Sequence, residues 1–271
     1  MDDIERYLLE DLGKEGDITS NSIFTKETGY GHIIAKQDCV VAGLTEAKQV
    51  FERTGSNVKL MANDGDRIIK NSIVAKIEGS MRSILTGERL ALNFICRMSG
   101  IATETRILVE KCQKINPNVR VAATRKTTPG FRKYEKKAVI IGGGDPHRYG
   151  LYDAVLIKDN HIKATESIVE AIKKVKNHVT DKIIEVEVEN ESDALAVAKM
   201  GVDAILIDNL DSKNAEILAK KIRQVDENIM IEVSGGINQH NILDYAIFAD
   251  RISLGYITHS IKSIDFALDV I

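Results

Sequence analysis

Residues 120–161 read RVAATRKTTPGFRKYEKKAVIIGGGDPHRYGLYDAVLIKDNH, and this stretch decides the fold of the chain. Two runs rich in β-forming and small apolar residues, 119–123 and 153–157, flank a segment of helical composition. Charged residues follow both runs: Arg125, Lys126 and Lys158. Parallel α/β barrels carry their chemistry at the carboxyl ends of strands. The stretch therefore predicts a strand–helix–strand unit with a site at the strand ends.

The same alternation continues to the end of the chain. Strands are predicted at 119–123, 153–157, 183–188, 203–207, 229–233 and 250–254. Helices are predicted at about 104–115, 131–140, 164–177, 191–200, 212–225, 238–246 and 260–270. Apolar strands alternating with helices indicate a parallel sheet covered by helices. Six strands fit an incomplete (β/α) TIM-like barrel or an open doubly wound sheet, and the absence of G-x-G-x-x-G and P-loop motifs weakens the second reading.

The first hundred residues have a different pattern. Short strand-like runs between 31 and 77 are broken by glycine and Asn/Asp turns, with a helix at 45–54 between them. We therefore expect a smaller N-terminal α+β domain, 1–103, joined by a C-terminal helix at about 262–271. The barrel domain would then comprise residues 104–261.

A predicted helix at 81–98 is apolar around most of its circumference and carries one narrow polar stripe. The stripe consists of Arg82, Thr86, Arg89, Asn93 and Arg97, which at 100° per residue lie within an arc of about 80°. A helix of this kind is buried on most sides. The stripe is expected to face an internal cavity or a seam between subunits, the alternative being a strip of surface arginines.

Each predicted strand delivers a polar residue or glycine at the same end, as a barrel mouth requires. These residues are Thr124, Arg125, Lys126, Lys158, His161, Glu187, Asp208, Ser234, Gly235, Gly236 and Gly255. Within EVEVE, Glu185, Glu187 and Glu189 alternate, so a strand points all three to one side. Helices cover a barrel outside, so these glutamates are expected to point inward, with Lys126, Arg148 and Lys158 as partners. The alternative is an exposed edge strand.

Two kinds of ligand site are expected at these strand ends. Glu187 and Asp208 are candidate ligands for Mg²⁺, which prefers oxygen donors, although Asp208 could instead cap the next helix. The small residues of SGGIN (234–238) and SLG (253–255) open onto helices, where unhindered backbone N–H groups can hold a phosphate. His259 lies close enough in sequence to reach such a phosphate or to cap a helix.

Composition excludes several classes of protein. The net charge of −3, 5% aromatic residues and no tryptophan argue against nucleic-acid binding. No apolar run approaches the ~20 residues of a membrane span, and the acidic amino terminus does not resemble a secretory signal. Three cysteines without C-x-x-C spacing indicate neither a disulfide framework nor a zinc site. A cytoplasmic, reduced environment is expected.

Three segments resemble the quinolinate phosphoribosyltransferase family, the nicotinate-nucleotide pyrophosphorylases (carboxylating). They are GERLALNFICRMSGIAT (87–103), TRKTTPG (124–130) and GGGDPHRYGLYDAVLIKDNHI (142–162). The resemblance extends over nearly the whole chain and implies the incomplete barrel. It also implies phosphoribosyl transfer from phosphoribosyl pyrophosphate to quinolinate with decarboxylation, which gives nicotinate mononucleotide in NAD synthesis. Pro146 departs from the family, where many relatives have Asn, so the geometry around His147 is less well defined by the resemblance.

The resemblance assigns roles to the strand-end residues. Quinolinate would be bound by Arg97, Thr124, Arg125, Lys126, His147, Arg148 and Lys158, with Arg97 lent by the partner of a homodimer. Phosphoribosyl pyrophosphate would be bound by Lys158, Glu187, Asp208, Ser234, Gly235, Gly236, Gly255 and His259. Lys126, Glu187 and Asp208 would be catalytic, and Glu187 and Asp208 would hold Mg²⁺. The residue chemistry agrees, because clustered cations suit two polyanionic substrates.

Three alternatives remain open from the sequence. The molybdenum-transport-associated paralogue shares the family fold, although the full TRKTTPG and LIKDNHI segments favour the quinolinate enzyme. A Schiff-base lyase using Lys126 or Lys158 would fit the same barrel. A non-catalytic binding barrel fits poorly with so many charged strand ends. The cations Arg132, Lys133, Lys136 and Lys137 could simply form a solvated helix face.

Overall fold

A computed structural model describes residues 2–165 and 167–271 of the chain. The chain forms two compact units. The first comprises Met1–Arg106, Lys137–Gly143 and Ile261–Ile271, and the second comprises Ile107–Lys136 and Gly144–Ser260. In the described part of the chain, every helix is too short or too polar to cross a membrane.

The first unit is built on an antiparallel sheet with the strand order β12-β1-β5-β3. Its strands are β1 (Thr28–Ala35), β3 (Asn57–Leu60), β5 (Ile73–Ser80) and β12 (Phe266–Val270), with β2 (Cys39–Val40) and β4 (Arg67–Ile68) as a separate pair. Its helices are α1 (Asp3–Leu12), α2 (Ile18–Ile23), α3 (Leu44–Thr54) and the first part of α4 (Met81–Gln113). Fully buried Ile33, Phe51, Ile84 and Phe94 belong to its core. The α+β character predicted for this region is confirmed.

The predicted C-terminal helix at 260–270 is wrong. The chain forms only a short helix, α11 (Tyr256–His259), and then the strand β12, which pairs antiparallel with β1 from Gly31↔Val270 to Ala35↔Phe266. The segment SIDFALDVI is compatible with either state on local pattern. The unpaired edge of β1 decides it, because tertiary pairing overrides a weak local preference.

Helix α4 corrects a second expectation. The sequence predicts two separate helices, at 81–98 and 104–115, but the chain forms one continuous helix. A Cβ at Gly100 would lie 2.4 Å from the carbonyl oxygen of Lys262. Glycine therefore serves close packing here and does not end the helix.

The second unit contains a parallel sheet with the order β6-β11-β10-β9-β8-β7. The strands are β6 (Arg120–Ala123), β7 (Val155–Ile157), β8 (Ile184–Val188), β9 (Ala204–Asp208), β10 (Met230–Ser234) and β11 (Arg251–Leu254). The first strand lies beside the last, as in a closing barrel, while β6 and β7 form the two free edges. The predicted incomplete barrel is confirmed.

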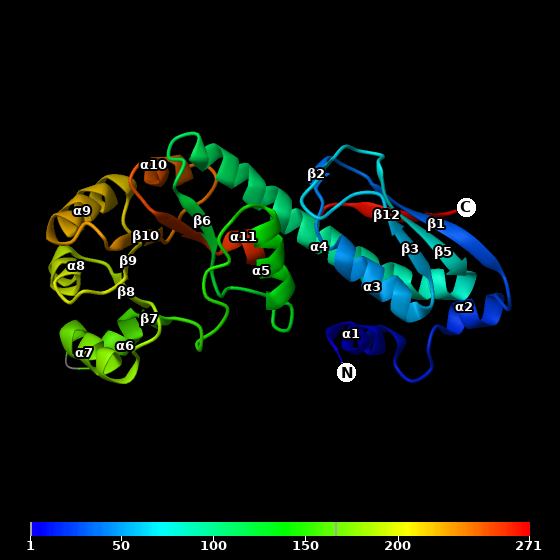
Figure 1. Ribbon diagram of the computed structural model, residues 1–271, viewed down its shortest axis with the longest axis horizontal. Helices are drawn as coiled ribbons and strands as arrows, with labels where there is room; N and C mark the ends of the chain where they lie inside the picture. Colours follow the sequence, from blue (N-terminus) through cyan, green and yellow to red (C-terminus); the bar gives the residue numbers. More distant parts are fainter. Residues whose placement is uncertain (1, 166) are drawn as a thin grey trace. The chain divides into compact units, whose positions relative to one another are not determined.

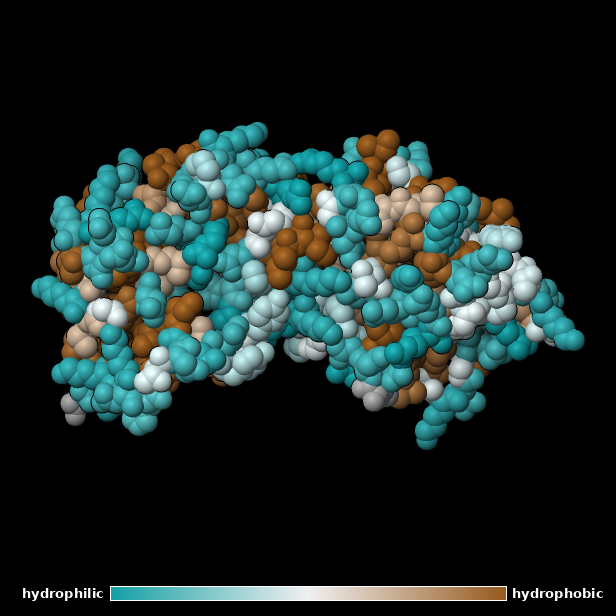
Figure 2. All heavy atoms as spheres, viewed as in Figure 1, coloured by the Kyte–Doolittle hydropathy of each residue, from teal (hydrophilic) through white to brown (hydrophobic). Residues whose placement is uncertain are grey.

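Helices alternate with these strands along the chain. They are α5 (Arg132–Ile141), α6 (Asp159–Lys163), α7 (Ile168–His178), α8 (Glu191–Ala198), α9 (Ser212–Val225) and α10 (Ile242–Ala246). Figure 1 shows α8 and α9 outside β8, β9 and β10. All five residues of β8 are buried, and two of them are glutamates, Glu185 and Glu187. The interior of the barrel is therefore partly polar at this strand. The face drawn in Figure 2 is mostly hydrophilic, in keeping with 28% charged residues.

Candidate active site

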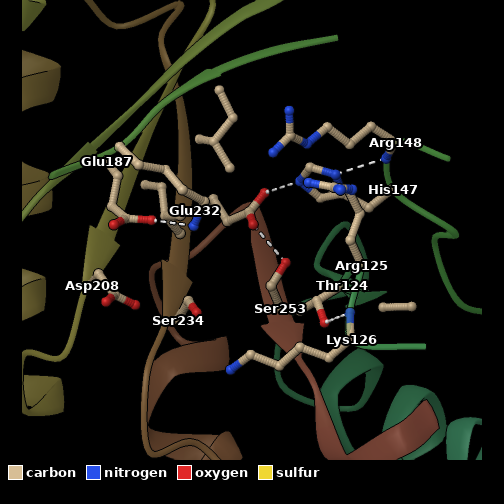
Figure 3. A pocket seen from close by; sticks show the side chains of 14 residues that line it. Thr124, Arg125, Lys126, His147, Arg148, Glu187, Asp208, Glu232, Ser234 and Ser253 are labelled. Carbon is tan, nitrogen blue, oxygen red and sulfur yellow. Dashed lines mark hydrogen bonds and ion pairs between the residues drawn. The ribbon is translucent and has the colours of Figure 1, made fainter. Parts of the chain in front are cut away.

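A cavity of about 340 Å³ lies at the carboxyl ends of the barrel strands (Figure 3). It is lined by Ala123, Thr124, Arg125, Lys126, His147, Arg148, Leu156, Lys158, Glu187, Leu206, Asp208, Glu232, Ser234 and Ser253. Every barrel strand, or the loop that follows it, contributes to this lining. The location is the one in which barrels of this kind carry their chemistry.

A second hollow of about 310 Å³ adjoins the first. The two share Thr124, Lys126, Asp208, Ser234 and Ser253, and the second adds Asn209, Gly235, Gly236, Ile237, Leu254, Gly255, Tyr256 and His259. Gly235 has φ +90°, and a Cβ there would lie 2.2 Å from Asn209 Oδ1. The turn after β10 therefore requires glycine. Glycines in such a turn allow a phosphate to approach the backbone N–H groups closely, as phosphate binding at a barrel mouth requires.

Most of the predicted site residues meet in these two cavities. The first contains Thr124, Arg125, Lys126, His147, Arg148, Lys158, Glu187, Asp208 and Ser234, and the second contains Gly235, Gly236, Gly255 and His259. His161 has a local role instead, because its Nδ1 accepts a hydrogen bond from the Lys158 N–H at 2.9 Å. Arg97 lies on α4 in the first unit and is absent from both linings. Its expected place in a partner's site stays a prediction.

The arginine stripe of α4 is only partly buried. Arg82 donates to the carbonyls of Phe24 and Asn21, and the Thr86 hydroxyl donates to Asp17 at 3.2 Å. This end of the stripe thus packs against the segment around α2. Arg89 and Asn93, farther along the stripe, are exposed.

The alternating glutamates are confirmed in part. Glu187 is buried and its Oε2 lies 2.8 Å from Lys158 Nζ, as expected. Glu185 is also buried, but its partner is His147 at 3.3 Å, where Lys126, Arg148 or Lys158 was expected. Glu189 lies beyond the end of β8 and is exposed, so the prediction that it points into the barrel is wrong.

Glu232 is a site residue that sequence reasoning missed. It is 2% exposed on β10, and its Oε2 lies 3.2 Å from His147 Nε2 and 3.0 Å from Arg251. Its other oxygen, Oε1, accepts a hydrogen bond from the Ser253 hydroxyl. The sequence gives one indication of its role: Glu232 is a single acid within the apolar run that precedes Ser234. An acid there is tolerated only with buried partners, and those partners come from the neighbouring strand β11 and from the loop that carries His147.

Glu185 and Glu232 set the charge of His147. Burial disfavours the imidazolium, but the hydrogen bonds and charges of the two carboxylates outweigh it and raise the pKa of His147 to about 9. The Arg148 N–H donates to His147 Nδ1 at 2.7 Å. A second proton, on Nδ1, must displace this N–H. The backbone hydrogen bond therefore favours the neutral ring and opposes the rise in pKa that the carboxylates cause.

The carboxylates respond to the same network in opposite directions. Burial and the Glu232 charge raise the pKa of Glu185. Burial would also raise the pKa of Glu232, but His147 and Arg251 outweigh it and lower the pKa to about 2. Arg251 also pairs with Asp145 at 3.2 Å, so a buried chain of alternating charges lies beside His147.

His147 sits on a strained turn. Its φ is +52°, in the left-handed region that few residues other than glycine adopt. Asp145 Oδ1 accepts a hydrogen bond from the His147 N–H at 2.7 Å and stabilises this conformation. Pro146 lacks an N–H and therefore leaves no donor unsatisfied at this point. The turn directs His147 and Arg148 toward the cavity (Figure 3).

Lys126 lines both cavities. Its N–H donates to the Thr124 hydroxyl at 3.1 Å, and its carbonyl accepts from the Thr258 hydroxyl at 2.7 Å. The side chain extends across the first cavity toward Ser234 (Figure 3). Lys126 is thus placed where a ligand in one cavity would meet a ligand in the other.

The two cavities differ in the chemistry that they offer. The first combines five cationic or cation-forming groups with carboxylates. Arg125, His147 and Arg148 lie across the cavity from Glu187 and Asp208, Lys126 extends between the two sides, and Lys158 pairs with Glu187. Guanidinium groups form bidentate contacts with carboxylates. The second cavity offers glycine backbone and hydroxyl groups, which suit phosphate oxygens. The pair can hold a small polycarboxylate against a phosphorylated compound.

Comparison with known proteins identifies the family. A family model described as "Quinolinate phosphoribosyl transferase, C-terminal domain" matches residues 101–269, and the model of the N-terminal domain matches residues 17–99. The chain is 44% identical to a probable nicotinate-nucleotide pyrophosphorylase [carboxylating] of Methanocaldococcus jannaschii, covering 99% of this chain and 96% of the relative. It is 41% identical to the protein of the same description from Bacillus subtilis, covering 98% and 92%.

Solved structures agree with the sequence comparison. The nicotinate-nucleotide pyrophosphorylase from Francisella tularensis superimposes with a TM-score of 0.92 at 34% identity, covering 99% of this chain and 94% of that chain. The structure titled NadC from Streptococcus pyogenes gives a TM-score of 0.91 at 37% identity, covering 99% and 95%. Similarity of this extent covers both units. The chain therefore belongs to the quinolinate phosphoribosyl transferase family.

Proposed function

We propose that this protein transfers the phosphoribosyl group of phosphoribosyl pyrophosphate to quinolinate with decarboxylation. The products are nicotinate mononucleotide, pyrophosphate and carbon dioxide. Family membership supports the reaction, since full-length relatives carry the description nicotinate-nucleotide pyrophosphorylase [carboxylating]. The observation that carries the proposal is the pair of adjoining cavities with Lys126 in both linings.

Quinolinate would occupy the first cavity. Its two adjacent carboxylates require more than one cation, and Arg125, Arg148 and Lys158 line this space. Protonated His147 would add a positive charge, and Thr124 would add a hydroxyl donor. Lys126 would approach the carboxylate that leaves as carbon dioxide. Arginine gives bidentate contacts and lysine a point charge, so the mixture can orient an asymmetric dianion.

Phosphoribosyl pyrophosphate would lie across the second cavity. The N–H groups of Gly235, Gly236 and Gly255, with Ser234 and His259, would hold its phosphate oxygens. The ribose would lie near Glu187 and Asp208, which line the first cavity from β8 and β9. Lys158 pairs with Glu187 and would be close to both substrates.

Glu187 and Asp208 fit a role in binding Mg²⁺. Both offer carboxylate oxygens from neighbouring strands, the donor type that this ion prefers. Within the described residues, the one group of three His, Cys, Asp or Glu side chains close enough to share an ion is His147, Glu185 and Glu232. Glu187 and Asp208 therefore form no closed cage, as suits an ion that also binds substrate phosphates. When bound, Mg²⁺ would neutralise charge on the departing pyrophosphate.

The residues support a mechanism without covalent attack by a side chain. The pyridine nitrogen would attack the anomeric carbon of the ribose as pyrophosphate leaves. Glu187 and Asp208 would stabilise the positive charge that develops on the sugar, because preorganised charges act strongly in a site shielded from water. The positive charge on the pyridinium nitrogen would then stabilise the carbanion that decarboxylation leaves on the ring, and protonation of that carbon would give nicotinate mononucleotide. Lys126 would hold the departing carboxylate in position.

We also propose a homodimer in which Arg97 of one chain reaches the quinolinate cavity of the other. The support is the family resemblance of the segment 87–103 and the stripe of exposed polar residues near it on α4. Mixing Arg97→Ala and Lys126→Ala chains tests it. Each variant alone would be inactive, but a mixed dimer would contain one intact site, so mixing would restore activity up to about a quarter of wild type. No restoration would contradict the shared site.

The reaction itself is tested by incubating the protein with Mg²⁺ and phosphoribosyl pyrophosphate and either quinolinate or nicotinate. Mononucleotide and carbon dioxide from quinolinate are the expected products. Formation of mononucleotide from nicotinate but not from quinolinate would contradict the decarboxylating reaction. No product from either acid would favour a different activity on the same barrel, such as that of the molybdenum-transport-associated paralogue.

A further inference from the structure

Helix α5 contacts both of the loops that carry the cations of the first cavity. One face of its first turn presents Arg132, Glu135 and Lys136, at positions i, i+3 and i+4. Glu135 and Lys136 have no exposed surface, so these residues do not form the solvated helix face that the sequence allowed. Lys133, on the same turn, is exposed.

The first loop, residues 124–131, is held through its threonines. The two carboxylate oxygens of Glu135 accept hydrogen bonds from the Thr128 N–H and hydroxyl, both at 3.0 Å. Arg132 Nε donates to the Thr127 hydroxyl at 2.9 Å. Arg125 and Lys126 immediately precede these anchored residues.

The second loop, residues 145–149, is held through its carbonyls. Lys136 Nζ donates to the Pro146 carbonyl, and Arg132 donates a second hydrogen bond to the Tyr149 carbonyl at 3.0 Å. His147 and Arg148 lie between these two carbonyls. Arg132 therefore contacts both loops and links them.

Burying charged groups costs several kcal/mol unless they are well partnered. Burial accordingly lowers the pKa of Lys136 to about 8, with Arg132, Asp145, Asp153 and Arg125 as the charged groups around it and the Tyr149 ring 5.4 Å from its Nζ. An uncharged residue would pack here at lower cost. The polar groups of this helix face are better explained by the loops that they hold.

We propose that Arg132, Glu135 and Lys136 are positioning residues, which fix the distance between the two cationic loops and thereby set the affinity for the dicarboxylate. The identity of that dicarboxylate as quinolinate rests on the proposed function. The residues proposed to hold the phosphates, Ser234 to Gly236 and Gly255, follow β10 and β11 and lie outside the two loops that these side chains hold. Loss of these contacts to the loops is therefore expected to raise the KM for the dicarboxylate more than the KM for phosphoribosyl pyrophosphate.

The kinetic test compares Arg132→Gln, Thr127→Val and the double variant with wild type. Arg132→Gln is expected to raise the KM for quinolinate about tenfold, as loss of a well-placed charge-assisted bond does. The KM for phosphoribosyl pyrophosphate is expected to change less than about twofold. The double variant is expected to match Arg132→Gln, since Thr127 acts through Arg132. Lys133→Gln removes an equal charge from the same turn and is the matched control, with kinetics like wild type.

Hydrogen exchange gives a readout that is independent of turnover. Amides of residues 124–131 and 145–149 are expected to exchange faster in Arg132→Gln than in wild type or Lys133→Gln. This measurement stands even if the wild-type protein forms no mononucleotide, a result that would refute the proposed function alone. If Arg132→Gln does not fold, Arg132→Lys replaces it, because lysine keeps the charge but not the geometry that spans both loops.

Three results would overturn the inference. One is unchanged exchange in both loops of the Arg132 variant. Another is an equal rise in both KM values, which would indicate general destabilisation. The last is multiplicative effects of Thr127→Val and Arg132→Gln, which would show that the two residues act separately.

Discussion

Replacing Glu232 by Gln is expected to lower the pKa of His147 without emptying the space that the side chain fills. Glu232 Oε2 lies 3.2 Å from His147 Nε2, and Glu185 provides the second carboxylate at 3.3 Å. Glutamine keeps the shape and one hydrogen-bonding oxygen but removes the charge. Arg251 keeps Asp145 as a partner at 3.2 Å, so the substitution does not leave the guanidinium without an acid.

The magnitude follows from the pKa of His147. Its rise from 6.5 to about 9 corresponds to roughly 3 kcal/mol of preference for the charged ring. Two carboxylates at similar distances share this preference, so removing one should withdraw about half of it. We expect the pKa of His147 in Glu232→Gln to fall by about one unit or slightly more.

The direction of the pH dependence is fixed by the raised pKa. The stabilisation from charged His147 is fully present below about 6.5 and is lost as the pH rises through about 9. Wild-type protein should therefore lose stability between these values, and its KM for quinolinate should rise over the same interval. In Glu232→Gln both changes should begin about one pH unit lower.

Histidine NMR titration measures this directly, with denaturant unfolding at pH 6.5, 8 and 9.5 as the second readout. Glu189→Gln is the matched control, because Glu189 is exposed and lies outside the barrel interior. A wild-type His147 that titrates near 6.5 would refute the reasoning. It would mean that the Arg148 N–H on Nδ1, at 2.7 Å, prevails over the carboxylates. An unchanged pKa in Glu232→Gln would refute it as well.

Three further predictions follow from the site. Glu187→Ala is expected to lower kcat by about 10²–10³-fold with little loss of stability, since Lys158 can turn to solvent; near-normal turnover in steady-state assays would reject its role. Gly235→Ala places a methyl group 2.2 Å from Asn209 Oδ1 at φ +90°. We therefore expect a loss of about 1–3 kcal/mol in unfolding free energy and a raised KM for phosphoribosyl pyrophosphate. An unchanged KM would argue against phosphate binding at this turn. Chelation with EDTA is expected to abolish activity and added Mg²⁺ to restore it, while full activity of metal-free protein would remove the metal from the account.

The sequence predicted the parts of this fold that repeat. The strand–helix alternation gave all six barrel strands, because each has a buried apolar run of its own. The strand ends then identified most of the cavity lining, from Thr124 to Gly255, since parallel strands bring their carboxyl ends together. These features are local in sequence and need no knowledge of distant partners.

The features that the sequence did not predict depend on distant contacts. β12 is a strand because β1 has a free edge for it, and nothing within 266–270 shows that edge. Glu232 matters because His147, Arg251 and Ser253 surround it, and these residues come from two other segments, the loop at 145–149 and β11. Glu189 was placed inside the barrel by alternation alone, which does not reveal that β8 ends at Val188.

The burial of Lys136 could not be predicted from the local sequence either. A lysine within a run of cations on a predicted helix is usually solvated, and the local pattern gives no other indication. Its burial becomes visible only when the loop at Pro146 is folded against α5. Charge patterns therefore locate a site more reliably than they identify the residues that support it.

The central claim is that cations from separate strand ends converge on one dicarboxylate, with Lys126 beside the group that leaves. The most direct test measures carbon dioxide release from carboxyl-labelled quinolinate by wild type and Lys126→Ala at saturating phosphoribosyl pyrophosphate and Mg²⁺. We predict stoichiometric release with mononucleotide in wild type and a loss of about 10²–10³-fold in the variant. Release by Lys126→Ala at a rate close to that of wild type would contradict the account.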